Sequence, residues 1–182
     1  MSFVVWLFLL LSPPCLRDEI ELLGVNIKPL QEHLLNLLNF EGAHVGLDEA
    51  VRGLAPALRG KKPKNVPHTA WQLVEHMRIG QWDILEFCRD AKHVSPKWPE
   101  GYWPKSAAPP SEAAWKKSIA GFRHDLNEMK KLVKDANEEK LYSRIPHGDG
   151  QTLLREALLV ADHNSYHLGQ LVLLRKMLGA WK

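Results

Sequence analysis

The sequence predicts an all-α fold, a four-helix bundle with a long crossover connection between its second and third helices. Three observations support this prediction. Apolar residues recur every three or four positions in four long stretches, which is the spacing of a helix. No stretch shows the strict alternation typical of a strand. A proline-rich segment without periodicity separates the second helix from the third, and its length would let these two helices run parallel.

The first half of the bundle follows from apolar periodicity and one capping residue. Residues 26–40 carry leucines at helical spacing, and residues 47–60 form a shorter, less regular helical piece. A second long helix is expected from about His68 to Asp90. Thr69 is suited to the N-cap of this helix, because its hydroxyl oxygen can accept a hydrogen bond from a backbone N–H of the first turn.

The second half of the bundle carries equally clear boundary signals. The third helix should open at Ser111, a serine N-cap followed by an acidic first turn. The fourth helix should run from about Thr152 to Leu178. It should end at Gly179, a residue type that readily adopts the left-handed conformation found at helix C-termini.

The chain divides into an apolar leader, residues 1–16, and a single domain, residues 17–182. The apolar run 3–11 is shorter than the roughly 20 residues that a spanning helix needs, so no stable membrane span is expected. No Lys or Arg precedes the run and no typical cleavage site follows it. The leader is interpreted either as a tail added by an upstream start codon or as a secretion signal.

Composition excludes some functions and favours a compartment. The net charge is +3, and no stripe of Lys and Arg interleaved with aromatic residues is present, so nucleic acid is not an expected partner. The two cysteines, Cys15 and Cys88, cannot form a disulfide framework. This favours the cytoplasm, with export as the alternative if the leader acts as a signal.

Two histidines stand four positions apart in the fourth helix, within ADHNSYHLGQ. At about 100° per residue, His163, His167 and Gln170 lie within about 60° of one another, in the same sector as Glu156 and several leucines. The pair therefore lies inside the apolar stripe, where two imidazoles need hydrogen-bond partners or a shared cation. Metal ligation and a pair of hydrogen-bonded core histidines both fit this helix alone.

The second long helix offers a third ligand, His76, beside its own apolar stripe. Gly80 follows one turn later, and its missing side chain would clear space beside a ligand or allow close helix packing. His68 competes for the third position from the entrance of that helix. The remaining histidines fall in loops or on polar faces.

HTAWQLVEHMRIGQWDIL and, much later, DHNSYHLGQLVLLRKMLGAW resemble the DinB-like superfamily of metal-binding four-helix bundles. This superfamily includes YfiT-type bacillithiol transferases and mycothiol-dependent maleylpyruvate isomerases. The resemblance covers roughly residues 25–181. It implies a metal triad of His76, His163 and His167, commonly holding Zn or Ni, and a homodimer. Gln170 matches the residue after the histidine pair, where it would bind the metal itself, hydrogen-bond to a ligand histidine or pack between helices.

The resemblance implies a metal-dependent transferase that activates a low-molecular-weight thiol for attack on a small electrophile. Which group performs the chemistry is open, since the ion could activate either a thiol or a water. A metal-dependent hydrolase is one alternative and would need a carboxylate base. Glu156 and Asp83 are the candidates, although we expect Glu156 to orient a histidine and Asp83 to lie in a surface ion pair.

The second alternative is a non-enzymatic, stress-associated bundle that binds metal. The proline-rich segment bears on this choice, because Trp98, Tyr102 and Trp103 would either form a lid over a pocket or plug the open end of the core.

Overall fold

The computed structural model describes residues 26–181, and the leader 1–16 lies outside the described residues. The helices are α2 (Lys28–Leu38), α3 (Leu47–Val51), α4 (Ala70–Arg89), α5 (Glu112–Lys134), α6 (Glu138–Tyr142) and α7 (Leu153–Met177), with a 3-10 turn, η1 (Pro56–Leu58). Residues 26–181 contain no strand, so the all-α prediction is confirmed.

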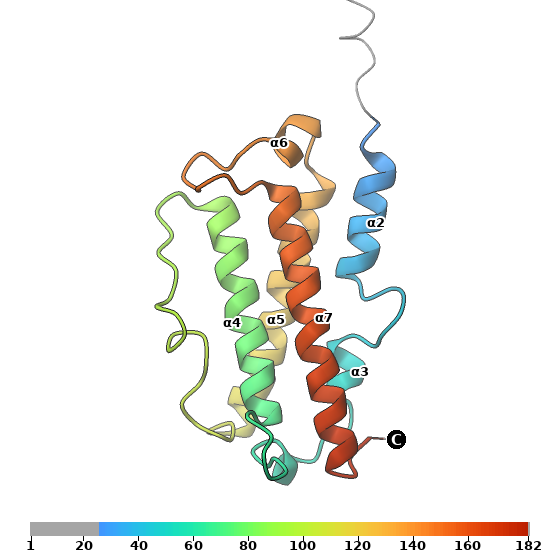
Figure 1. The fold of residues 1–182 in the computed structure, drawn as a ribbon, viewed down its shortest axis with the longest axis vertical. Helices are drawn as coiled ribbons and strands as arrows, with labels where there is room; N and C mark the ends of the chain where they lie inside the picture. The colour runs from blue at the N-terminus through green and yellow to red at the C-terminus, as the bar shows by residue number, and fades with distance from the viewer. Residues whose placement is uncertain (1–25, 182) are drawn as a thin grey trace, which may run out of the picture.

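The four longest helices lie side by side, with α4 packed against both α5 and α7 and with α2 against α5 and α7 (Figure 1). Figure 1 also shows residues 90–111 returning along the outside of α4, so that α5 starts near the same end of the molecule as α4. The two helices point in one direction, and α7 points in the other. The proline-rich segment thus lies alongside the helix that carries His76.

α4 and α5 begin at the predicted caps, and α7 begins directly after Thr152, where its start was expected. Thr69 accepts from the backbone N–H of Gln72 at 3.2 Å, and the Gln72 side chain accepts from the Thr69 N–H at 3.1 Å, which completes a capping box. Ser111 and Thr152 accept from the backbone at the starts of α5 and α7. Gly179 follows the end of α7 with φ of +66°, the left-handed conformation expected there.

The expected helix over residues 47–60 is shorter than predicted. α3 ends at Val51, and Gly53 adopts a φ of +67°, which takes the chain out of the helix before Pro56 opens the 3-10 turn. The short helix α6 was not predicted. Asn137 caps it by accepting from the Lys140 N–H at 2.8 Å.

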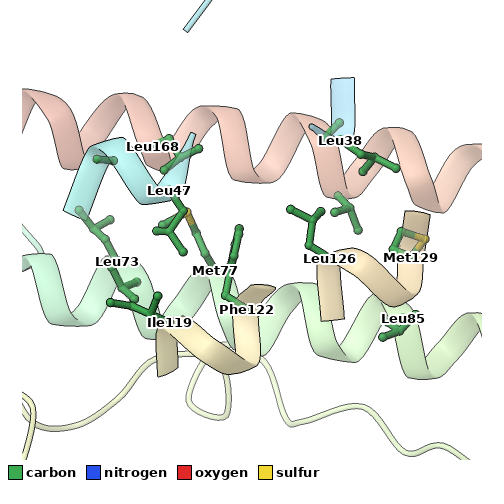
Figure 2. Packing of buried hydrophobic residues seen from close by; sticks show 14 of the residues in the cluster. Leu38, Leu47, Leu73, Met77, Leu85, Ile119, Phe122, Leu126, Met129 and Leu168 are labelled. Carbon is green, nitrogen blue, oxygen red and sulfur yellow. The ribbon is translucent and has the colours of Figure 1, made fainter. Parts of the chain in front are cut away.

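Apolar side chains from α2, α3, α4, α5 and α7 meet in one core. Figure 2 shows Leu38, Leu47, Leu73, Met77, Leu85, Ile119, Phe122, Leu126, Met129 and Leu168 directed toward one another between the helices. Phe122 and Met77 are almost completely buried at its centre. Burial of a side chain of this size contributes about 1.5–3 kcal/mol to folding, so this packing holds α4 and α5 together.

No helix within residues 26–181 combines the length and the apolarity needed to cross a membrane.

Candidate metal centre

Three histidines from two helices meet inside the bundle. His76 lies on α4, and His163 and His167 lie one turn apart on α7, which packs directly against α4. One nitrogen from each ring lies within 4.8 Å of the others. His76 and His167 are buried and His163 is partly buried. The structure therefore brings together the three residues that sequence spacing and resemblance had singled out.

Two of the three rings are oriented by oxygen acceptors. His76 Nδ1 lies 3.0 Å from the backbone oxygen of Tyr102, and His167 Nδ1 lies 2.9 Å from Gln170 Oε1. Both oxygens can only accept, so each Nδ1 carries the hydrogen and donates it. The lone pair of each neutral ring is then on Nε2. Metal-binding histidines are commonly fixed in this way.

The third ring, His163, packs over Gly80. A Cβ on Gly80 would lie 3.1 Å from His163 Cε1, closer than ordinary van der Waals contact, so this glycine makes room for the ring. Gly80 thus makes room for the ring of a candidate ligand, which is one of the two roles considered for it. Across the helix pair His163 faces His76, and the Nε2 atoms of these two rings are 3.1 Å apart.

The donor set fits a divalent transition metal. In a tetrahedral site with metal–nitrogen bonds of about 2.0–2.1 Å, two ligand nitrogens stand about 3.3 Å apart, close to the His76–His163 separation. Neutral imidazole nitrogens are good ligands for Zn and Ni. The residues present therefore suit such an ion.

The surroundings keep all three rings neutral. Burial lowers the pKa of His76 to about 4, against the opposing effect of the Tyr102 hydrogen bond, and the neighbouring His163 and His167 lower it further. Burial, followed by the neighbouring His167, lowers the pKa of His163 to about 4. Burial also lowers the pKa of His167. At neutral pH the three nitrogens are free to bind a cation without first losing a proton.

An aromatic ring from the proline-rich segment covers one side of this cluster. Trp103 stacks on His76 with ring centroids 3.7 Å apart and planes within 5°, and it meets His167 edge-on at 5.9 Å. The other face of Trp103 stacks on His68 at 3.8 Å. His68 is thus separated from the cluster by a tryptophan. Trp98 is 66% exposed and takes no part in the covering.

Asp83 corrects one expectation, because it is buried rather than part of a surface ion pair. Its carboxylate accepts from the Tyr102 hydroxyl at 2.6 Å and binds His93 Nε2 at 2.7 Å. Burial and this contact raise the pKa of Tyr102 to about 12, so the hydroxyl remains a donor. Asp83 thereby anchors the residue whose backbone oxygen orients His76. A backbone acceptor carries no sequence signal, so this link was missed.

Gln170 and Glu156 have different surroundings. Gln170 contacts His167, as described above. Glu156 is buried, but its hydrogen-bond partner is Arg155 at 2.6 Å, and no hydrogen bond joins it to the three histidines within residues 26–181.

Burial and the nearby Glu156 raise the pKa of Cys88 to about 12, so this thiol is not a nucleophile at neutral pH.

Comparison with known protein families assigns the chain to one superfamily. The family model of the DinB superfamily matches residues 39–171. The chain belongs to the DinB superfamily. The matched range contains the three clustered histidines, Gly80 and Gln170, so the candidate site lies wholly within the part that the DinB superfamily defines. No curated protein and no solved structure matched the chain significantly.

Proposed function

We propose that this DinB-superfamily protein binds one divalent transition metal, Zn or Ni, through His76, His163 and His167 and acts as a thiol transferase. Its substrates would be a low-molecular-weight thiol and a small electrophile. The observation that carries the proposal is the convergence of three neutral ring nitrogens within 4.8 Å of one another.

The number and charge of the ligands favour catalysis over a purely structural role. Closed structural zinc sites usually take four protein ligands, whereas three leave a position for substrate. A bound divalent ion would lower the pKa of a thiol and so supply a thiolate near neutral pH. Since all three ligands are uncharged, none of the ion's charge would be cancelled by the protein.

The chain's own residues would hold this site in place. The Tyr102 oxygen and Gln170 Oε1 fix the rings of His76 and His167, and Gly80 admits the ring of His163. Trp103 excludes water from one side of His76 by stacking on it.

A hydrolase is less well supported than a transferase. It would need a carboxylate base beside the ion, and the two carboxylates considered for that role are engaged elsewhere. Asp83 binds Tyr102 and His93, and Glu156 binds Arg155. The non-enzymatic, metal-binding bundle remains the competing proposal, because it needs the same three ligands and no further group.

Bound metal and thiol transfer can be measured on the same preparations. The protein, free of a histidine tag, would be analysed for metal content as wild type, His76→Ala and His163→Ala. His147→Ala is the control, because His147 binds the backbone oxygen of Phe87 and lies outside the cluster. We expect about one metal ion per chain in the wild type and the control, and little in the two variants.

The same four proteins would then be incubated with cysteine and 1-chloro-2,4-dinitrobenzene, and formation of the thioether, with release of chloride and a proton, would be followed. Metal-dependent transfer in the wild type and the control supports the proposal. A wild type that neither carries nor takes up Zn or Ni would overturn it. Bound metal without transfer across a series of thiols and electrophiles would favour the non-enzymatic bundle.

A further inference from the structure

A small cavity lies one turn beyond the histidine cluster, where the end of α7 meets the start of α4 and the loop before it. Its volume is about 200 Å³, and its walls are mainly apolar. Leu73 and Leu174 are buried, whereas Leu173 and Met177 are more than half exposed at its rim. No Asp, Glu, Lys or Arg side chain lines it. The cavity is therefore suited to an uncharged group.

Two polar residues join this cavity to the candidate metal centre. Gln170 lines the cavity and also accepts the hydrogen of His167 Nδ1. His68 lines it too, and its ring stacks on Trp103, whose other face stacks on His76. Only one side chain therefore separates the cavity from His167, and only two separate it from His76.

The amide of Gln170 has one hydrogen-bonding group left over. Its oxygen is used by His167, and within residues 26–181 no hydrogen bond is found for its Nε2 amino group. An amide nitrogen can only donate, so the complementary ligand atom is an acceptor oxygen. A carbonyl meets this need without bringing a charge into an apolar pocket, which a carboxylate would do at a high desolvation cost.

We propose that this cavity is a binding site for an uncharged, compact aromatic or alicyclic carbonyl compound. The apolar body of the compound packs against Leu73, Leu173 and Leu174, and its carbonyl oxygen accepts from Gln170 Nε2. This inference goes beyond the proposed function, because none of the three candidate metal ligands lines the cavity. It gives Gln170 two roles, because one end of the amide orients a ligand histidine and the other binds the carbonyl compound.

The volume of the cavity limits the size of the ligand that it can take. Sites for drug-sized molecules are commonly about 300–1,000 Å³, so a cavity of this volume takes a single ring with a short substituent rather than a fused or extended ligand. The open rim formed by Leu173 and Met177 leaves one end of the ligand in contact with solvent.

Binding of unreactive probes tests this assignment separately from the chemistry. The zinc-loaded full chain would be titrated with acetophenone, with ethylbenzene, which lacks the carbonyl, and with benzoate, which is charged. Ligand-observed NMR would report each Kd. We expect acetophenone and ethylbenzene to bind and benzoate not to bind.

Gln170→Glu tests the hydrogen bond, because it keeps an oxygen for His167 and replaces the amino donor with an oxygen that repels a carbonyl. The ratio of the ethylbenzene Kd to the acetophenone Kd should fall at least fivefold, since one hydrogen bond contributes about 1 kcal/mol. Bound zinc should remain near one per chain. An unchanged ratio would overturn the role assigned to Gln170.

Leu173→Glu tests the location of the subsite. Leu173 is 59% exposed, so the change should leave the fold intact, and it should weaken both probes at least tenfold. Leu158→Glu is the matched control, since Leu158 is 45% exposed on the same helix and lies outside the cavity. Equal probe binding in these two variants would place the probes elsewhere and overturn the subsite.

Metal content and sedimentation of the same samples distinguish the ways of failing. Zinc-loaded protein that binds neither probe overturns the subsite and leaves the proposed function standing. Protein that binds the probes but no metal overturns the proposed function and leaves the carbonyl-binding site standing. A dimer that excludes the probes and dissociates in Leu173→Glu would show that a second copy covers this cavity.

Discussion

His93 and His76 lie at two ends of one chain of contacts, yet their surroundings differ in a decisive way. His93 faces the carboxylate of Asp83 at 2.7 Å, a partner that can compensate a positive charge on an imidazole. His76 faces a backbone oxygen and two other histidines, which cannot. A partly buried histidine bonded to a carboxylate, such as His93, joins two segments of the chain. Buried histidines that have only neutral partners suit a cation supplied from outside.

The strongest test of this contrast is stabilisation by zinc. Zinc at a hundredfold excess over its Kd should stabilise the wild type by about 2.7 kcal/mol. The Tm should rise by on the order of 5–10 °C, measured by thermal unfolding with zinc and with a chelator. His163→Ala should lose this response and His93→Ala should keep it. Loss of the response in both variants would remove the distinction between His93 and the histidine cluster.

Asp83→Asn should affect His93 and the histidine cluster at once. The asparagine keeps the shape but loses the charged acceptor for Tyr102 and His93, which should cost about 2 kcal/mol of unfolding free energy. Zinc affinity should fall about tenfold, because the Tyr102 oxygen no longer holds His76 firmly. Glu86→Gln, which weakens an exposed ion pair with Arg89, is the control for denaturant unfolding and zinc titration. Unchanged zinc affinity in Asp83→Asn would show that the contact between Asp83 and Tyr102 does not hold His76 in place for zinc.

The metal-free protein should lose stability as the pH falls. Below a pH of about 6.5 the unfolded chain takes up protons on these histidines, whereas folded His76 and His163 stay neutral until the pH approaches about 4. Their contribution is therefore complete above pH 6.5 and is lost as the pH falls toward 4.

The loss should reach on the order of 1 kcal/mol per ring by pH 5, measured by urea unfolding between pH 7 and pH 5. His163→Gln should flatten this dependence, and His147→Gln should not. Equal slopes in the two variants would contradict the low pKa of His163.

Gly80→Ala should have the smallest effect on stability. Alanine favours a helix by about 1 kcal/mol over glycine, but here its Cβ would press on His163 at 3.1 Å, so the two effects should nearly cancel. Zinc affinity should still fall severalfold as the ring is displaced. Gly169→Ala is the control, because nothing lies within 4 Å of a Cβ there, and it should stabilise α7 without changing zinc affinity. Equal zinc affinity in both variants would make Gly80 a packing residue only.

Local signals were sufficient for the all-α class and for the starts of the long helices. Thr69, Ser111 and Thr152 mark the starts of the long helices, because a cap involves residues only two or three positions apart. The failures also have local causes. Residues 47–60 have helical spacing, but Gly53 takes a left-handed conformation that no periodicity reveals, and α6 has too few residues to show a period.

The candidate site was predictable only in part. His163 and His167 share a helix, so their spacing showed that they share a face. The contacts around them depend on how distant segments meet. The approach of Gly80 to His163, the Tyr102 oxygen on His76 and the burial of Asp83 all join residues from different parts of the chain. Such contacts follow from tertiary packing, which helical periodicity does not describe.

The stacking of Trp103 between His68 and His76 has a spectroscopic consequence. An indole in face-to-face contact with an imidazole lies in the field of any cation that the imidazole binds, so its emission should respond to that cation. Trp103 is therefore a built-in optical probe of His76. In a variant whose other tryptophans are replaced by phenylalanine, fluorescence would follow zinc arrival at the cluster in real time, without a label or a substrate.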